Sequence, residues 1–108
     1  MEFQLGSALL DACVLSILHK QDTYGYKLTH ELKETLNVSE STLYPVLRRL
    51  TKENYLETYD QEHLGRNRRY YRLTEKGREK YEEYYSQWIS FQEKVTKIMK
   101  GGKENDED

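Results

Sequence analysis

The sequence predicts a mainly α-helical chain with one small β-hairpin, and therefore an α+β fold. Two observations predict it. Apolar residues recur at helical spacing in four separate segments. Between the third and fourth of these lie two runs rich in Tyr and Thr, which flank a polar stretch containing a glycine. We therefore expect three helices, then a hairpin, then a long final helix.

The first two helices are predicted from apolar residues four positions apart. Over residues 5–19 two such rows run side by side, which indicates a broad buried face with Cys13 as a small core residue. A polar break follows, where Asp22 or Thr23 can cap a second helix. Because Tyr24 shares the apolar face of that helix, we expect it in the core. The apolar face consists of Tyr24, Leu28, Leu32 and Leu36.

A third helix is predicted over residues 41–53, with Ser39 or Ser41 as its cap. Pro45 in a helix interior would remove a hydrogen bond and crowd the preceding turn, so we favour Ser41, which keeps Pro45 near the start. The buried face would be Leu43, Val46, Leu47 and Leu50. The opposite face and its flanks would carry Ser41, Tyr44, Pro45, Arg48, Arg49 and Lys52.

Residues 55–60 and 69–74 are predicted to be strands, joined by a polar loop over 61–68 that contains Gly65. Positive charge is concentrated near this loop, with seven Lys or Arg residues against two Glu between residues 66 and 80. The whole chain has a formal net charge of −2. A local basic segment is nevertheless suited to phosphates, because distribution matters more than the total.

The final helix has the clearest periodic pattern. Thr74 is expected to cap it, and its apolar residues follow heptad spacing: Tyr81, Tyr84, Trp88, Phe91, Val95 and Ile98. A helix over 75–99 would be roughly 37 Å long, at about 1.5 Å per residue. Because that exceeds the width of a small domain, part of this stripe should lack an intrachain partner, and we predict a homodimer.

These elements suggest a DNA-binding domain over 1–74, a dimerisation helix over 75–100 and a disordered acidic tail over 101–108. An apolar share of 36% is low for a self-sufficient core, which also favours a partner subunit. The single cysteine and the lack of a signal segment or a membrane-length apolar run favour a cytoplasmic protein without membrane contact. The three histidines fall on different elements, so we expect no metal, no cofactor and no enzyme activity.

Three helices followed by a two-stranded ribbon is the order of a winged helix-turn-helix, which lays its recognition helix in the major groove of DNA. The polar face of the third helix and the Arg- and Asn-rich loop tip are suited to bases and phosphates of double-stranded DNA. An ordinary solvated face and a solubilising turn are the alternatives. The predicted DNA contacts are Ser41, Thr42, Tyr44, Pro45, Arg48, Arg49, Lys52, Arg66, Asn67 and Arg68.

Three motifs resemble the PadR family of bacterial transcriptional regulators. They are Tyr24-Gly25-Tyr26, the run Leu43-Tyr44-Pro45-Val46-Leu47-Arg48-Arg49-Leu50, and the segment from Gly65 to Gly77 that begins Gly65-Arg66-Asn67-Arg68-Arg69-Tyr70-Tyr71. The resemblance spans about residues 5–99, and the single C-terminal helix is similar to the short, LmrR-like subfamily. It implies repression at a near-palindromic operator and dimerisation through the last helix packed with the first.

The resemblance further implies that Trp88 lines a pore between subunits, where a planar aromatic ligand can stack. The alternative is that Trp88 only fills the dimer interface. Three functions stay open: a repressor released by a small aromatic ligand or a stress signal, a winged-helix adaptor that binds a protein, and a sensor whose main property is binding multiple drugs. The basic loop favours DNA binding, since an adaptor does not need it.

Overall fold

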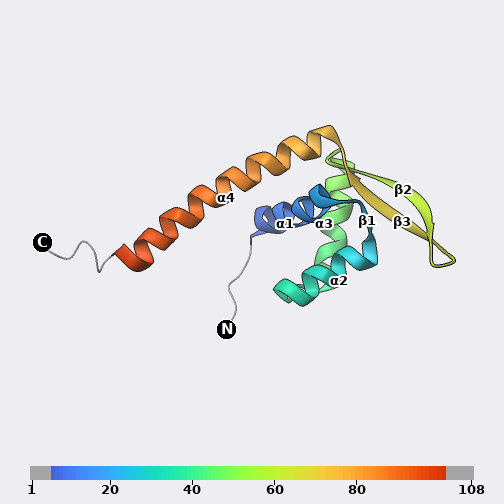
Figure 1. Cartoon of the computed structure of the whole chain (residues 1–108), viewed down its shortest axis with the longest axis horizontal. Coiled ribbons are helices and arrows are strands. Elements are labelled where there is room, and N and C mark those ends of the chain that lie inside the picture. The colour runs from blue at the N-terminus through green and yellow to red at the C-terminus, as the bar shows by residue number, and fades with distance from the viewer. Residues whose placement is uncertain (1–5, 102–108) are drawn as a thin grey trace, which may run out of the picture.

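The computed structural model describes residues 6–101, and its elements follow the expected order (Figure 1). They are α1 (Ser7–Lys20), β1 (Thr23–Tyr24), α2 (Gly25–Leu36), α3 (Glu40–Lys52), β2 (Leu56–His63), β3 (Arg66–Leu73) and α4 (Glu75–Gly101). The predicted α+β fold with a hairpin and a long last helix is confirmed. The tail predicted for 101–108 lies outside the described residues apart from Gly101, which is the last residue of α4.

The core lies where α1, α2 and α3 meet the base of the sheet. The helical periodicity selects most of the helical core, because the apolar positions of all three helices point to one centre. Leu15 lies outside the predicted rows and is also fully buried. Burial of each such side chain contributes roughly 1.5–3 kcal/mol relative to leaving it exposed. The fully buried aliphatic residues include Val14, Leu15, Leu28, Leu43, Leu47, Leu50 and Leu56. Cys13 is partly buried at the margin of this cluster.

The sheet has three antiparallel strands in the order β1-β3-β2. The short strand β1 was not expected: Thr23 pairs with Tyr71, and Tyr24 pairs with Tyr70. The prediction that Asp22 or Thr23 caps the second helix is therefore wrong, because both precede or form this strand, and α2 begins at Gly25 without a side-chain cap. Tyr24 is also not in the helical core, since its strand position turns its ring toward the hairpin.

The hairpin is longer than predicted. Its strands pair continuously from Leu56 and Leu73 to His63 and Arg66, which leaves a two-residue turn. Leu64 and Gly65 have φ of 54° and 79°, and positive φ at both central residues is what a type I′ turn requires. The polar loop predicted over 61–68 is therefore mostly strand. Both faces of the ribbon are polar there, so no alternation of apolar residues indicated a strand.

The start of α3 also differs from the prediction. Ser39, not Ser41, is the cap: its Oγ accepts a hydrogen bond from the Thr42 N–H at 3.3 Å. Pro45 consequently lies in the second turn of the helix, where it has no N–H to donate to the preceding turn. The exposed position of Pro45 keeps its ring out of the core.

The long helix α4 begins as predicted, with the Thr74 hydroxyl accepting from the Gly77 N–H at 3.0 Å. Its first half packs along α1, where the ring of Tyr81 stacks on His19 with centroids 4.1 Å apart. At 27 residues it is about 40 Å long, and its second half projects beyond the rest of the chain (Figure 1). Part of the apolar stripe thus lacks a partner within the described chain.

Candidate nucleic-acid interface

The outward face of α3 is polar and positively charged. Ser41, Pro45, Arg48 and Lys52 are exposed, as the helical periodicity predicts, and Thr42 is exposed beside Ser41. The hydroxyls of the first turn form a cluster, because Ser39 Oγ lies 3.0 Å from both Ser41 Oγ and Thr42 Oγ1. Such a face offers hydroxyl and guanidinium donors in one row along a helix of 13 residues.

Arg49 does not share this exposed row. Its guanidinium donates to Asp11 Oδ1 on α1 at 2.6 Å and lies 3.5 Å from Glu53. The Asp11 side chain is only 8% exposed, so this pair anchors α3 to α1 at a buried carboxylate. The hydrogen bond to Asp11 raises the pKa of Arg49, which keeps the guanidinium charged. Arg49 is therefore committed to a contact within the chain.

The wing, defined here as the β2–β3 ribbon from residues 57 to 72, has two faces with different surroundings. Because side chains alternate along a strand, Asn67, Arg69 and Tyr71 share one face, which we call the inner face. Tyr71 and Tyr44 both lie against Gly25, within contact distance of a side chain built there. The inner face of the wing therefore adjoins α3.

Two arginines lie near the Tyr71 phenol at the junction between the wing and α3. Burial raises the pKa of its phenol, against the opposing effect of the nearby guanidinium groups of Arg69 and Arg48. Arg48 of α3 and Arg69 of the wing thus both lie near Tyr71, where the two elements meet. The sequence interpretation omitted Arg69. The prediction restricts the wing contacts to the loop over 61–68 and places Arg69 in the following strand over 69–74, so Arg69 is not among them.

The outer face of the wing carries the alternate residues of β3. Arg68 stacks over the Tyr24 ring, with its guanidinium carbon 4.6 Å from the ring centroid. Arg72 donates to Glu57 at 2.8 Å and lies over the Tyr59 ring. Arg66 follows the turn and is exposed. Among the three predicted wing contacts, Arg66 and Asn67 are exposed, whereas Arg68 is partly buried against the body.

A cavity of about 410 Å³ lies between α1 and α4. It is mainly apolar, and its lining residues are Leu9, Ala12, Cys13, Ser16, Leu36, Tyr84, Tyr85 and Trp88. Burial raises the pKa of the Cys13 thiol and of the Tyr84 phenol, so both groups are neutral here at ordinary pH. The predicted ligand residue Trp88 is therefore on a cavity wall, at the point where α4 leaves α1.

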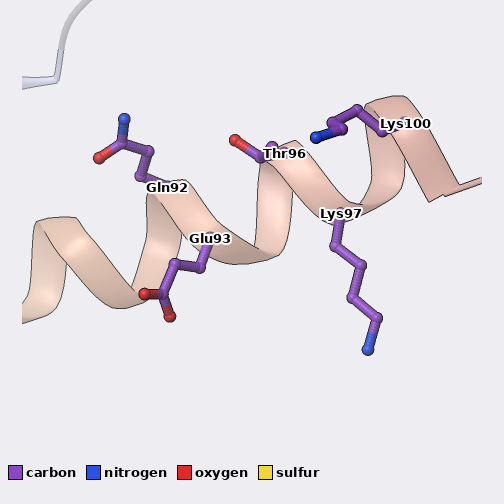
Figure 2. A pocket seen from close by; sticks show the side chains of 5 residues that line it. All are labelled: Gln92, Glu93, Thr96, Lys97 and Lys100. Atoms are coloured by element: carbon purple, nitrogen blue, oxygen red, sulfur yellow. The ribbon is translucent and has the colours of Figure 1, made fainter.

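A second hollow follows the far end of α4, but its side chains do not converge. Figure 2 shows Glu93 and Lys97 pointing to one side of the helix while Gln92 points to the other. Over residues 6–101 there is no cluster of three or more His, Cys, Asp or Glu side chains placed to hold a metal ion. Within the same range, no helix combines the length and apolar character needed to span a bilayer.

Three helices, a short third strand and a projecting hairpin define a winged helix-turn-helix protein, here extended by one long C-terminal helix. Residues 14–83 match the transcriptional regulator PadR-like family. The chain belongs to this family, whose members are regulators of transcription and not enzymes. The resemblance seen in the sequence motifs is thereby confirmed.

Solved structures agree with this assignment. A Streptococcus mutans UA159 protein is 37% identical to this chain, and the match covers 94% of this chain and 95% of that protein, with a TM-score of 0.87. A PadR-like transcriptional regulator from Bacillus cereus is 34% identical over 85% of this chain and 92% of its own, with a TM-score of 0.80. Bacillus subtilis PadR, solved in complex with operator DNA, is 26% identical over 71% of this chain and 45% of its own, with a TM-score of 0.63.

Proposed function

We propose that this protein is a cytoplasmic repressor that binds a near-palindromic operator in double-stranded DNA as a homodimer. The observation that carries the proposal is the continuity of the exposed face of α3 with the inner face of the wing, around Tyr44 and Tyr71. A helix in the major groove with an adjoining ribbon on the backbone is how winged helices hold DNA. The complex of Bacillus subtilis PadR with operator DNA supports the same partner here.

The proposed contacts are exposed or half-exposed side chains of α3, of the inner face of the wing and of its tip. From α3 they are Ser41, Thr42, Tyr44, Pro45, Arg48 and Lys52, and from the wing they are Arg66, Asn67 and Arg69. Arg48, Lys52, Arg66 and Arg69 supply the positive charge that phosphates attract. Arg49 and Arg68 hold partners within the chain, and we assign them to support these contacts.

The salt dependence of DNA binding tests this surface. Arg48→Ala and Arg69→Ala should each weaken binding to a duplex from the region upstream of the protein's own gene, and each should reduce the magnitude of the log Kd against log salt slope by about 0.9. Lys97→Ala is the matched control, because it removes one positive charge at the far end of α4 (Figure 2). Slopes that stay at the wild-type value in both arginine variants would reject the surface.

The dimer is proposed from the free half of the stripe on α4. Trp88, Phe91 and Ile98 are 39%, 60% and 78% exposed, whereas Tyr81 and Tyr84 pack against α1. Contiguous exposed apolar side chains at heptad spacing are typical of a helix that meets a second helix. A second copy would present a second α3 to a half-site about one helical turn away.

The cavity beside Trp88 favours a second function, in which a small planar aromatic ligand binds there and releases the DNA. Tyr84, Tyr85 and Trp88 provide rings for stacking, and the volume suits a drug-sized molecule. Because Trp88 is the only tryptophan, its fluorescence reports the site directly. Quenching by planar dyes, with loss of the DNA complex, is expected; intact DNA binding without quenching would remove the ligand role.

The adaptor alternative predicts a different outcome. A protein-binding winged helix has no need for Arg66 and Arg69 on an exposed ribbon. Retention on heparin at moderate salt, followed by a gel shift with the upstream duplex, should therefore be observed if the protein acts on DNA. Failure of both would favour a protein partner.

A further inference from the structure

We propose that Tyr24 and Arg68 form a clamp that sets the angle of the wing against α3, so that Arg68 is a positioning residue and not a phosphate contact. The inference deepens the proposed function and rests on it, because it concerns how the wing is aimed at DNA. Neither residue is assigned this role by the family match or by the sequence motifs.

The wing needs such support because most of it is only two strands wide. Among the described residues, β1 pairs with β3 at Tyr70 and Tyr71 alone. From there to the turn, β2 and β3 pair only with each other. A two-stranded ribbon is marginally stable and twists readily when nothing packs on it. Its tip would therefore swing unless a contact outside the hydrogen-bond ladder held it.

Tyr24 supplies that contact from the strand that precedes α2. Its ring centre lies 4.6 Å from the guanidinium carbon of Arg68 and 5.4 Å from the ring of His63, so it contacts both strands of the ribbon. It also meets Tyr70 edge-on, with centroids 5.6 Å apart. One aromatic ring joined to the body thus holds three residues of the wing.

The surroundings of Arg68 explain why it is a poor phosphate contact. Its Nε is buried and has no hydrogen-bond partner among the described residues. A buried donor without a partner is costly, and the attraction between a cation and an aromatic face is what offsets that cost here. Arg68 also lies on the outer face, whereas Arg69 lies on the inner face with Tyr71.

A second set of contacts on the outer face of the wing also reaches the segment ahead of α2. Tyr70 stacks on Tyr59 with centroids 5.5 Å apart, and the Tyr59 hydroxyl donates to Asp22 at 2.7 Å. The Arg72 guanidinium carbon also lies over the Tyr59 ring, 4.8 Å from its centre. Asp22 and Tyr24 therefore both join the segment ahead of α2 to the outer face of the wing.

The test separates positioning from phosphate contact by combining affinity with salt slope. Tyr24→Leu keeps the bulk but removes the aromatic face, and Arg68→Ala removes the cation. Each should weaken binding to the upstream duplex roughly three- to tenfold, the scale expected for one such contact, while the salt slope stays near the wild-type value. Arg69→Ala should instead reduce the slope by about 0.9. Tyr24→Phe keeps the ring and should bind as the wild type does.

Hydrogen exchange without DNA distinguishes failure of the clamp from failure of the proposed function. Amides of 60–63 and 66–69 should exchange faster in Tyr24→Leu and Arg68→Ala, with those of α1 and α3 unchanged, which also shows that the variants are folded. A ribbon that loosens in a protein that binds no DNA would support the clamp and reject the proposed function. Unchanged exchange in both variants, or a slope reduced by about 0.9 in Arg68→Ala, would overturn the clamp.

Discussion

Gly77 lies in the first turn of α4, where the helix crosses the backbone at Tyr55. A Cβ at this position would be 2.0 Å from the Tyr55 carbonyl oxygen, which belongs to the backbone and cannot rotate away. On a free helix surface, Gly→Ala stabilises by about 1 kcal/mol. Here we expect Gly77→Ala to destabilise the fold by about 1–3 kcal/mol, because the helix must shift to relieve the overlap.

Urea unfolding followed by circular dichroism measures this effect. Ser90→Ala on the exposed side of the same helix is the control and should be neutral or slightly stabilising. A gain in stability for Gly77→Ala would show that α4 does not approach Tyr55 this closely.

Arg49 allows a second test on a single side chain. Arg49→Ala would leave the Asp11 carboxylate buried without its ion pair, so we expect a loss of about 1–3 kcal/mol in the free energy of unfolding. The double variant with Asp11→Ala should lose less than the sum of the two single changes. The salt slope of DNA binding should remain that of the wild type. A slope lower by about 0.9 would instead place Arg49 on a phosphate.

Among the elements, the turn of the wing combines strain with exposure. Leu64 has φ of 54° and is 84% exposed, so it adopts a left-handed conformation without burying its side chain. Asn tolerates this conformation better and Asn-Gly is a preferred type I′ pair. Leu64→Asn should therefore raise stability by roughly 0.5–1 kcal/mol, seen as a higher midpoint in thermal unfolding. Gly65→Ala should lower the midpoint, because φ there is 79°. Midpoints equal to that of the wild type in both variants would argue against this turn.

The elements also show what a sequence can and cannot predict. The faces of α1, α2 and α3 follow from a period that is visible within each segment, and most of the core residues are predicted for that reason, although Tyr24 and Leu15 are exceptions. The strand β1 has two residues and exists because it pairs with Tyr70 and Tyr71, which lie far along the chain. No local pattern reveals such a pairing, and the second-helix cap was misplaced as a result.

The same distinction holds for the candidate site. The exposed row on α3 was predictable because it lies opposite the buried residues of one helix. The partners of Arg49 and Arg68 were not, since they come from α1 and β1 and depend on how the elements pack. Arg69 falls in the strand predicted over 69–74, and only the preceding loop was expected to reach DNA, so it is absent from the predicted contacts.

At the scale of the whole molecule, the wing and the free half of α4 project in opposite directions from the helical body (Figure 1). The helix α1 connects these parts, because it packs against α4 and its Asp11 binds Arg49 of α3. The helix α1 therefore lies between the α4 stripe and the proposed DNA surface. Pairing of two chains along α4 would fix the separation of two such surfaces.

Disrupting the stripe tests that arrangement. Phe91→Glu and Trp88→Glu each place a charge among exposed apolar side chains, and burying an unpaired carboxylate between two helices is unfavourable. We expect both variants to sediment as folded monomers, and the wild type as a dimer at the same concentration. Affinity for the operator should fall by about 100-fold or more, because two half-sites are no longer bound by one linked pair.

Ser86→Glu is the matched control for these variants, since it introduces the same charge at an exposed position of α4 outside the stripe. It should remain dimeric and keep its operator affinity. Binding to a single half-site should be nearly equal in all three variants, because the contacts of α3 and the wing are within one chain. A Phe91→Glu protein that stays dimeric would move the interface to another surface, and the spacing of the two recognition helices would then have to follow from that surface.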